Sequence, residues 1–241
     1  MIELTNLRCE FDKRVILENV SIKIKNHLSV LGANGSGKST LAKAICGLVP
    51  YEGEIKLNTH DIETLSLKEK AKTISYIPAK LEIYDNFIRV EEFVLLGRFP
   101  YKKSFFDYGE NDKKIVKETL EFLKISHLKE HAVSSLSSGE QQLTLIAQAL
   151  AQQSQIIIFD EPTANLDPCN SKIIAERIKG LKERCQIILI THDLHLACYV
   201  DSPVLFIKEK RVHYYEREFF EDATLHELYG VEFSSLAVKY D

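Results

Sequence analysis

The residues best suited to chemistry form a glycine-rich stretch at 32–40, Gly-Ala-Asn-Gly-Ser-Gly-Lys-Ser-Thr. An apolar run precedes it and a helix-forming run follows, which is the context in which G-x-x-x-x-G-K-[ST] binds phosphate. Glycines let backbone N–H groups point at phosphate oxygens, and the helix start adds a positive dipole end. We expect Lys38 to reach the β- and γ-phosphates and Ser39 to bind Mg²⁺; a glycine-rich turn with an incidental lysine is the alternative. The residues predicted to bind nucleotide here are Gly32, Asn34, Gly35, Ser36, Gly37, Lys38, Ser39 and Thr40.

A pair of carboxylates, Asp160 and Glu161, closes the apolar run 155–159. Such a run is typical of a parallel strand buried on both faces, and parallel sheets bind ligands at the carboxyl ends of their strands. We expect Asp160 to hold the water shell of the Mg²⁺ ion that Ser39 touches, and Glu161 to accept a proton from an attacking water. The alternative for Glu161 is an acidic residue that merely precedes a helix. Two adjacent carboxylates in this place are costly unless a cation lies near them, which favours the functional role.

Two further segments carry groups that could touch phosphate. His192 follows the apolar run 186–190 and could donate a hydrogen bond to a γ-phosphate; a structural or merely exposed histidine is an equal alternative. A second group precedes a long helical pattern, where a Ser-Gly start is a common helix cap and is equally an anion site. This group consists of Ser137, Ser138, Gly139 and Glu140.

Hydrophobic periodicity predicts the elements that hold these residues. Strands are expected at 2–4, 20–25, 28–31, 52–57, 74–78, 155–160 and 186–190, and helices at 41–46, 66–73, 90–96, 112–128 and 170–184. Residues 203–207 and 211–215 are candidates for a hairpin whose turn lacks glycine, and residues 217–241 have a helical pattern. No clear strand occurs between about 82 and 138, which indicates a helical insertion in an α/β core.

Composition limits the class of protein. A chain of 241 residues with 45% hydrophobic content can bury the core of one domain. The net charge of −4, with both signs spread along the chain, gives no reason to expect nucleic acid as a partner. The five cysteines lack metal-ligand spacing and suit reduced, buried thiols in a cytosol. Because no secretory signal or bilayer-spanning run is present, we expect a protein that is soluble by itself.

In order and spacing these segments resemble the nucleotide-binding subunit of ABC transporters. Residues 32–40 match its Walker A motif, 156–161 match Walker B with its catalytic glutamate, and 136–140 (Leu-Ser-Ser-Gly-Glu) resemble the LSGGQ signature. Residues 164–167 resemble the D-loop, and His192 falls on the switch histidine. Phe11 stands where an aromatic side chain stacks on the base in the family; an aromatic that covers a sheet edge is the alternative.

The resemblance covers almost the whole chain and implies a fold. We expect an α/β protein: a P-loop NTPase (RecA-like) core with an N-terminal antiparallel β subdomain and an inserted α-helical subdomain. Residues 1–241 would form a single ABC ATPase domain. Within it, 1–81 and 139–241 would form the β subdomain and the P-loop core, and 82–138 the helical subdomain.

A narrower resemblance points to importer ATPases for ferric siderophores, haem and vitamin B12. It rests on residues 95–100 (Leu-Leu-Gly-Arg-Phe-Pro), 110–112 (Glu-Asn-Asp) and 191–197 (Thr-His-Asp-Leu-His-Leu-Ala). One departure concerns the glutamine that the family keeps after the strand at 74–78, where it ligates Mg²⁺ and couples to the membrane subunit. This chain has Ala79 and Lys80 there, and we expect water or Glu82 to fill the gap.

The resemblance also implies a mechanism and partners. Two copies would enclose ATP and Mg²⁺ as a homodimer, with Lys38, Glu161 and His192 as catalytic residues and Ser39 and Asp160 at the metal. Hydrolysis would drive uptake of an iron complex or cobalamin through integral-membrane permease subunits, served indirectly by a substrate-binding protein. The chain would lie in the cytoplasm, peripheral on the inner membrane face. A soluble non-transport ABC ATPase and a hydrolysis-impaired regulatory ATP-binding subunit are the alternatives.

Overall fold

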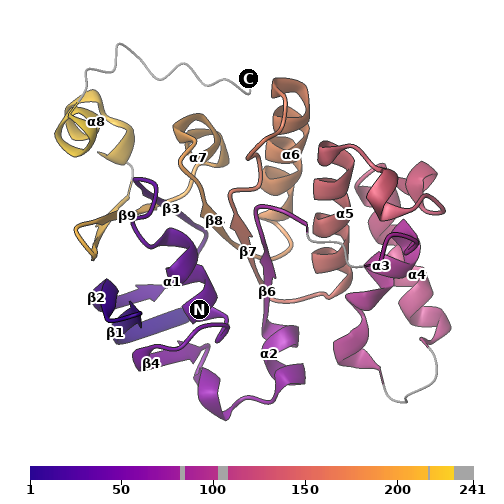
Figure 1. The fold of residues 1–241 in the computed structure, drawn as a ribbon, viewed down its shortest axis with the longest axis horizontal. Coiled ribbons are helices and arrows are strands. Elements are labelled where there is room, and N and C mark those ends of the chain that lie inside the picture. Colours follow the sequence, from indigo (N-terminus) through magenta and orange to yellow (C-terminus); the bar gives the residue numbers. More distant parts are fainter. Residues whose placement is uncertain (82–84, 103–107, 217, 231–241) are drawn as a thin grey trace.

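The computed structural model describes residues 1–81, 85–102, 108–216 and 218–230, and these form two β-sheets with helices around them (Figure 1). The first sheet is antiparallel, with strand order β2-β1-β4-β5. Its strands are β1 (Ile2–Phe11), β2 (Arg14–Ile24), β4 (Glu52–Leu57) and β5 (His60–Asp61). The expected antiparallel β subdomain at the N-terminus is therefore present.

The second sheet has strand order β10-β9-β3-β8-β7-β6, and all neighbours except β10 and β9 run parallel. Its strands are β3 (Leu28–Gly32), β6 (Ile74–Ile77), β7 (Ile156–Asp160), β8 (Gln186–Ile190), β9 (Val204–Lys208) and β10 (Arg211–Tyr215). The carboxyl ends of β3, β7 and β8 therefore meet at one edge of this sheet. Three of the four segments predicted to bind phosphate or its metal ion, at 32–40, 160–161 and 192, lie at the ends of these strands, whereas the fourth, at 137–140, lies at the start of the helix 138–151.

Eight α-helices surround the sheets in the described residues. They are α1 (Lys38–Ile45), α2 (Leu67–Thr73), α3 (Val90–Leu96), α4 (Glu110–Phe122), α5 (Ser138–Ala151), α6 (Pro168–Leu181), α7 (Leu194–Val200) and α8 (Asp222–Tyr229). In the described parts of 82–138, the regular elements are α3, α4 and short 3₁₀ turns, with no named strand. In Figure 1, α3 and α4 stand beside α5, away from the antiparallel sheet.

The two faces of the parallel sheet bury different cores. Ile156, Ile158 and Ile190 pack in one apolar cluster with α1 and the antiparallel sheet. Ile157 and Phe159 pack in a second cluster with α3, α4, α5 and α6. All five residues of β7 are buried, as the continuous apolar run predicts. Helix α1 therefore lies between the two sheets, where its first residues face the ends of β3 and β7.

Helix α4 ends earlier than the sequence pattern predicts. The periodicity runs from 112 to 128, but the helix ends at Phe122, and a separate 3₁₀ turn covers Ser126–Leu128. Lys124 adopts a left-handed conformation (φ 60°), and the Ile125 N–H donates to the carbonyl of Leu120 at 2.9 Å. This is a Schellman-type end in which lysine takes the position that glycine usually holds. Because Ile125 and Leu120 are both buried, their packing stabilises an end that the sequence does not signal.

The C-terminal elements agree with the expected patterns. β9 and β10 form the expected hairpin, and its turn residues Glu209 (φ 51°) and Lys210 (φ 68°) are both left-handed, as a two-residue type I′ turn requires. Helix α8 lies within the segment expected to be helical, whose last residues, 231–241, fall outside the described part. Among the described helices none has both the length and the apolar character needed to cross a bilayer.

Candidate nucleotide site

The loop between β3 and α1 has a backbone that only glycine fits at two positions. Gly32 has φ +150°, and a Cβ there would lie 2.6 Å from the carbonyl oxygen of Ile207. Gly37 has φ +104°, and a Cβ there would lie 2.9 Å from the Ile16 side chain. The loop is thus fixed by its neighbours β9 and β2. Such a loop at the start of a helix leaves backbone N–H groups available for an anion.

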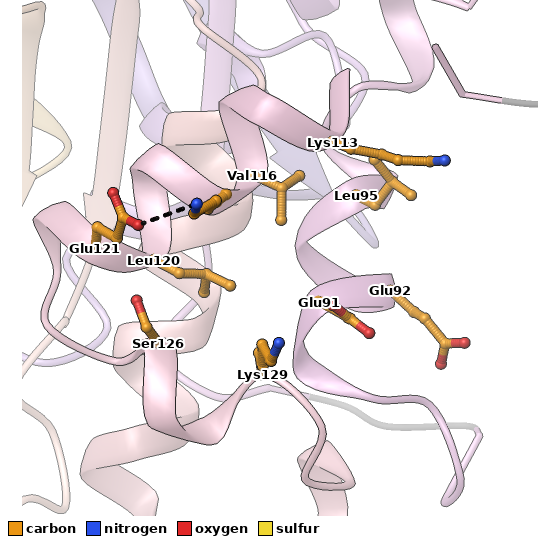
Figure 2. Close-up of a pocket in the computed structure, with 10 residues that line it drawn as sticks. Glu91, Glu92, Leu95, Lys113, Val116, Leu120, Glu121, Ser126 and Lys129 are labelled. Atoms are coloured by element: carbon orange, nitrogen blue, oxygen red, sulfur yellow. Dashed lines mark ion pairs between the residues drawn. The ribbon is translucent and has the colours of Figure 1, made fainter. Parts of the chain in front are cut away.

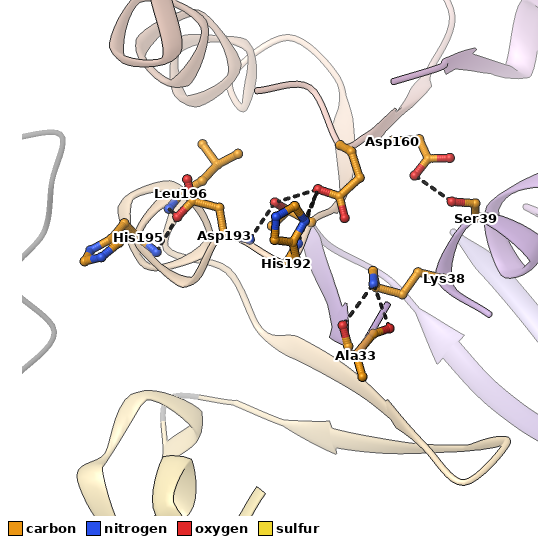
Figure 3. A network of polar contacts seen from close by, with 11 residues as sticks. Ala33, Lys38, Ser39, Asp160, His192, Asp193, His195 and Leu196 are labelled. Atoms are coloured by element: carbon orange, nitrogen blue, oxygen red, sulfur yellow. Dashed lines mark hydrogen bonds and ion pairs between the residues drawn. The ribbon is translucent and has the colours of Figure 1, made fainter. Parts of the chain in front are cut away.

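Lys38, the first residue of α1, is buried next to this loop (Figure 3). Its ammonium group donates hydrogen bonds to the carbonyl oxygens of Gly32 at 2.9 Å and Ala33 at 3.1 Å. Burial lowers the pKa of Lys38, while the carboxylates of Glu161 and Asp160 act in the opposite direction. The cation is therefore held against the concave side of the loop, where a phosphate would replace two neutral carbonyls with a charged partner.

Ser39 and Asp160 meet at the end of β7. The Ser39 hydroxyl donates to Asp160 Oδ1 at 3.0 Å, and the Tyr76 hydroxyl donates to Oδ2 at 2.6 Å. Burial and this hydrogen bond raise the pKa of Tyr76, so its hydroxyl stays protonated and remains a donor. Asp160 is only 4% exposed, and both of these partners are uncharged. A buried carboxylate with neutral partners, beside a serine hydroxyl, offers the oxygen ligands that Mg²⁺ prefers.

Glu161 follows Asp160 and turns toward the end of β8. Its Oε2 atom accepts a hydrogen bond from His192 Nδ1 at 2.9 Å, and longer ones from the His192 N–H and the Thr191 hydroxyl, both at 3.3 Å. The backbone of Glu161 is left-handed (φ 50°), a conformation that costs energy in a non-glycine residue. In this conformation the carboxylate reaches His192 at the end of β8. Asp193 then caps α7 by accepting from the N–H groups of His195 and Leu196 (Figure 3).

Ser137 and Glu140 form a reciprocal cap at the start of α5. Glu140 accepts from the Ser137 N–H at 2.9 Å and from its hydroxyl at 2.6 Å, while Ser137 Oγ accepts from the Glu140 N–H at 3.4 Å. Ser137 and Glu140 therefore satisfy each other's hydrogen bonds, and these bonds do not extend to Lys38 or Asp160. Within one copy of the chain, residues 137–140 therefore form a separate group from the β3, β7 and β8 ends.

The family model described as "ABC transporter" matches residues 17–164. That match covers more than half of the chain and includes the loop at 32–40 and the carboxylates at 160–161. The chain belongs to the ABC transporter family. It is an ATP-binding, ABC-type ATPase, with the P-loop NTPase fold expected from the sequence.

Curated relatives of this ABC cassette carry transport names. A "Probable iron chelatin transport ATP-binding protein" of Helicobacter pylori is 34% identical over 88% of this chain and 85% of its own length. The "Probable siderophore transport system ATP-binding protein YusV" of Bacillus subtilis is 33% identical over 88% and 78%. The "Manganese transport system ATP-binding protein MntB" of Halalkalibacterium halodurans is 33% identical over 87% and 84%.

Solved structures show the same architecture. A bacterial ABC transporter cassette in dimeric form superposes with a TM-score of 0.76 at 28% identity, covering 88% of this chain and 97% of that one. The structure cbiO1 from Clostridium perfringens, described as part of the ABC transporter complex cbiONQ, has a TM-score of 0.79 at 26% identity. It covers 94% of this chain and 92% of its own.

Two further places that the sequence singled out are Phe11, at the end of β1, and the segment after β6. Phe11 ends β1 and is 38% exposed, so its ring is free to meet a planar group from solution. Ala79 and Lys80 follow Pro78, the residue after β6, and stand where the resemblance led us to expect glutamine. Glu82, the side chain expected to compensate, lies outside the described residues.

Sequence reasoning missed two neighbours of the site. Tyr76 reaches Asp160 from the adjacent strand β6, and the only sequence signal for it was its place on a strand that ends near the loop. Asn170, in the first turn of α6, packs so closely on Gly139 that a Cβ at 139 would lie 2.5 Å from its Cγ. Asn170 Nδ2 also donates to Asp167 Oδ2 at 2.6 Å. Gly139 and the D-loop are therefore linked within one copy through Asn170.

Because Asn170 is held by its hydrogen bond to Asp167, replacing Gly139 by Ala is expected to displace the start of α5. A displacement of about 1 Å at a positioning group can lower a catalytic rate by about a hundredfold. We therefore expect a large loss of ATP hydrolysis in Gly139→Ala, with little change in the unfolding temperature. The double variant Gly139→Ala with Asn170→Ala removes the close contact and should recover much of the rate. A double variant no more active than the single one would show that the contact with Asn170 is not the cause.

A cavity in the helical part of the cassette is distinct from the phosphate loop. It measures about 500 Å³ and lies between α3, α4 and the turn at 126–128 (Figure 2). Its charged lining residues carry both signs in equal number: Glu91, Glu92, Glu121, Lys113, Lys117 and Lys129. This mixed lining gives no excess of positive charge for phosphate, which supports the β3–α1 loop as the nucleotide site.

Proposed function

We propose that this chain is the ATP-hydrolysing subunit of an ABC importer that takes up an iron complex, such as a siderophore or haem, or cobalamin. The observation that carries the enzymatic part is the convergence of Lys38, Ser39, Asp160, Glu161 and His192 at the ends of three adjacent parallel strands. The iron and siderophore names of two relatives support the substrate class. A manganese relative of similar identity supports a free metal ion as the second candidate.

The nucleotide would lie between two copies of the chain. The loop 32–40 of one copy would hold the phosphates, and Phe11 would stack on the base. Ser137, Ser138, Gly139 and Glu140 of the second copy would face the γ-phosphate with the start of α5, a 14-residue helix. The separation of these residues from the Lys38 group within one copy supports this arrangement. A related cassette solved as a dimer supports this arrangement.

The residues at the strand ends have distinct parts in hydrolysis. Mg²⁺, held by Ser39 and Asp160, would neutralise charge on the β- and γ-phosphates. Lys38 would leave its two carbonyl partners and donate to phosphate oxygens. Glu161 would accept a proton from the attacking water, and His192 would orient Glu161 through the Nδ1 hydrogen bond and face the γ-phosphate. Positioning and charge neutralisation are what a loose phosphoryl-transfer transition state needs most.

Coupling to transport would involve partners on the membrane. We place the cassette in the cytoplasm, peripheral on the inner face of the membrane and bound to integral-membrane permease subunits, with a substrate-binding protein outside. Residues 82–138 would act as the helical subdomain of the single 1–241 domain and pass the dimer's opening to the permease. The relative that forms part of a transporter complex supports such an assembly. We propose no nucleic acid partner, because the net charge is −4 and charges of both signs are spread along the chain.

Ala79 gives a direct test of the hydrolysis-impaired alternative. We expect Ala79→Gln to change the ATPase rate little, because Mg²⁺ can take water in place of an amide oxygen. The rate would be measured with purified wild-type and variant proteins at saturating Mg-ATP. A many-fold gain in the ATPase rate, without loss of coupling to transport, would contradict the view that the wild-type site already functions. It would favour an impaired regulatory subunit.

Uptake measurements test the transport function. Cells lacking this chain should lose uptake of one labelled substrate among ferric siderophore, haem, cobalamin and manganese, and should regain it with the wild-type chain but not with Glu161→Gln. Loss of manganese uptake alone would replace the iron-complex proposal by the second candidate. Unchanged uptake of all four would favour a non-transport ABC ATPase.

A further inference from the structure

Tyr76 shares a sheet face with the carboxylate at the centre of the site. In the parallel pairing of β6 with β7, Tyr76 lies opposite Ile158, two residues before Asp160. Side chains two residues apart on a strand point to the same face, and a diagonal neighbour on the next strand is within reach of an aromatic side chain. Tyr76 and Asp160 therefore both point to the face that α1 covers, and this register brings the phenol to Asp160.

The Tyr76 phenol and the Ser39 hydroxyl each hydrogen-bond to a different carboxylate oxygen of Asp160. Tyr76 donates to Oδ2 at 2.6 Å and Ser39 to Oδ1 at 3.0 Å. A carboxylate at a strand end can rotate about its last bond, and fixing one oxygen fixes the plane of both. With Oδ2 held on the β6 side, Oδ1 stays on the side of Ser39, where a metal ion between Ser39 and the phosphates would lie.

We propose that Tyr76 is a positioning residue that orients Asp160 for the divalent cation of the ATP complex. This inference rests on the proposed function, because it needs the metal that accompanies the nucleotide. Groups that hydrogen-bond to a metal ligand typically change metal affinity by about 10- to 100-fold when they are removed. The Tyr76 ring is half-buried, and its hydroxyl donates a hydrogen bond to the buried carboxylate of Asp160. Ala79, which comes after the same strand, offers no side-chain oxygen to the metal. When the Ser39 hydroxyl binds the metal ion, the Tyr76 phenol remains as the hydrogen-bond donor that orients Asp160.

The test is Tyr76→Phe, which keeps the ring packing and removes only the hydroxyl. Mn²⁺ replaces Mg²⁺ as the probe, and its binding to the ATP-loaded protein is followed by electron paramagnetic resonance. We expect the affinity for Mn²⁺ to fall by about tenfold or more, while ATP binding without metal and the unfolding temperature of the nucleotide-free protein change little. The half-saturating Mg²⁺ concentration for hydrolysis should rise in the same proportion, with the rate at saturating Mg²⁺ largely retained.

Tyr214→Phe is the matched control, because Tyr214 is an exposed tyrosine on β10, at the opposite edge of the same sheet. It should bind Mn²⁺ like the wild type.

A double variant with Asp160→Asn shows whether Tyr76 acts through Asp160, since Tyr76→Phe should then cause no additional loss of Mn²⁺ affinity. Unchanged Mn²⁺ affinity in Tyr76→Phe, or an equal additional loss in the Asp160→Asn background, would overturn the inference alone. A wild-type protein that binds ATP but no Mn²⁺ would overturn the proposed metal site as well.

Discussion

Replacing Glu161 by Gln is expected to reduce steady-state ATP hydrolysis by about 10²- to 10⁴-fold, the usual contribution of a general base. Glutamine keeps an oxygen that can accept from His192 Nδ1, so the geometry around His192 and Thr191 should persist. What it lacks is the negative charge that takes a proton from water. ATP binding, measured with a fluorescent analogue, should therefore remain close to that of the wild-type protein.

Glu176→Gln is the matched control for this change. Glu176 lies exposed on α6, and its replacement makes the same chemical change away from the strand ends. It should hydrolyse ATP at the wild-type rate. If Glu161→Gln retained a rate within about tenfold of the wild type, less than one general base normally contributes, another group would have to be the base.

Lys38→Ala is expected to lower ATP affinity by about 10- to 100-fold and to reduce hydrolysis further. A hydrogen bond between a charged group and its partner contributes about 1.5–3 kcal/mol, and each 1.4 kcal/mol corresponds to about tenfold in affinity. Lys38 is the buried cation at this loop, and its two present partners are the carbonyl oxygens of Gly32 and Ala33. Isothermal titration calorimetry with ATP gives the affinity directly.

Lys43→Ala controls for the loss of a lysine from the same helix. Lys43 is in the last turn of α1, exposed and far along the helix from the loop. Its removal should leave ATP affinity within about twofold of the wild type, because a surface charge of this kind contributes little. Equal losses in the two variants would mean that the effect reflects general charge on α1 and not a phosphate contact at Lys38.

The parts of the fold that could be predicted from the sequence have strong local patterns. The buried strands β7 and β8 are short apolar runs, and the glycine loop has a fixed spacing of residues before a helix. The carboxyl ends of parallel strands lie at one edge of a sheet. The grouping of Lys38, Asp160 and His192 could therefore be predicted from three separate stretches of sequence. The family match then confirmed the class of fold and of enzyme.

The details that could not be predicted depend on backbone conformations without a residue signal. The end of α4 has Lys124 in a left-handed conformation, where glycine would have marked the end. The β9–β10 turn likewise has two non-glycine residues with positive φ, Glu209 and Lys210. In both places the packing of the flanking elements holds a conformation that the local sequence disfavours.

Contacts between site residues and side chains of other helices or strands could not be predicted from local sequence patterns either. The contact of Tyr76 with Asp160 depends on the register between β6 and β7, and the contact of Asn170 with Gly139 depends on the docking of α6 against the start of α5. Neither relation appears as a spacing along the chain. Both matter for the proposed mechanism, because one orients a metal ligand and the other links the signature segment to the D-loop.

The pairing of two copies around ATP is tested by the oligomeric state of Glu161→Gln in solution. Light scattering after size-exclusion chromatography should show a monomer without nucleotide and a dimer with Mg-ATP, because the nucleotide is bound but not hydrolysed. The further change Lys38→Ala should return it to a monomer. A Glu161→Gln protein that is saturated with Mg-ATP and still monomeric would contradict a site built from the loop 32–40 of one copy and residues 137–140 of the other.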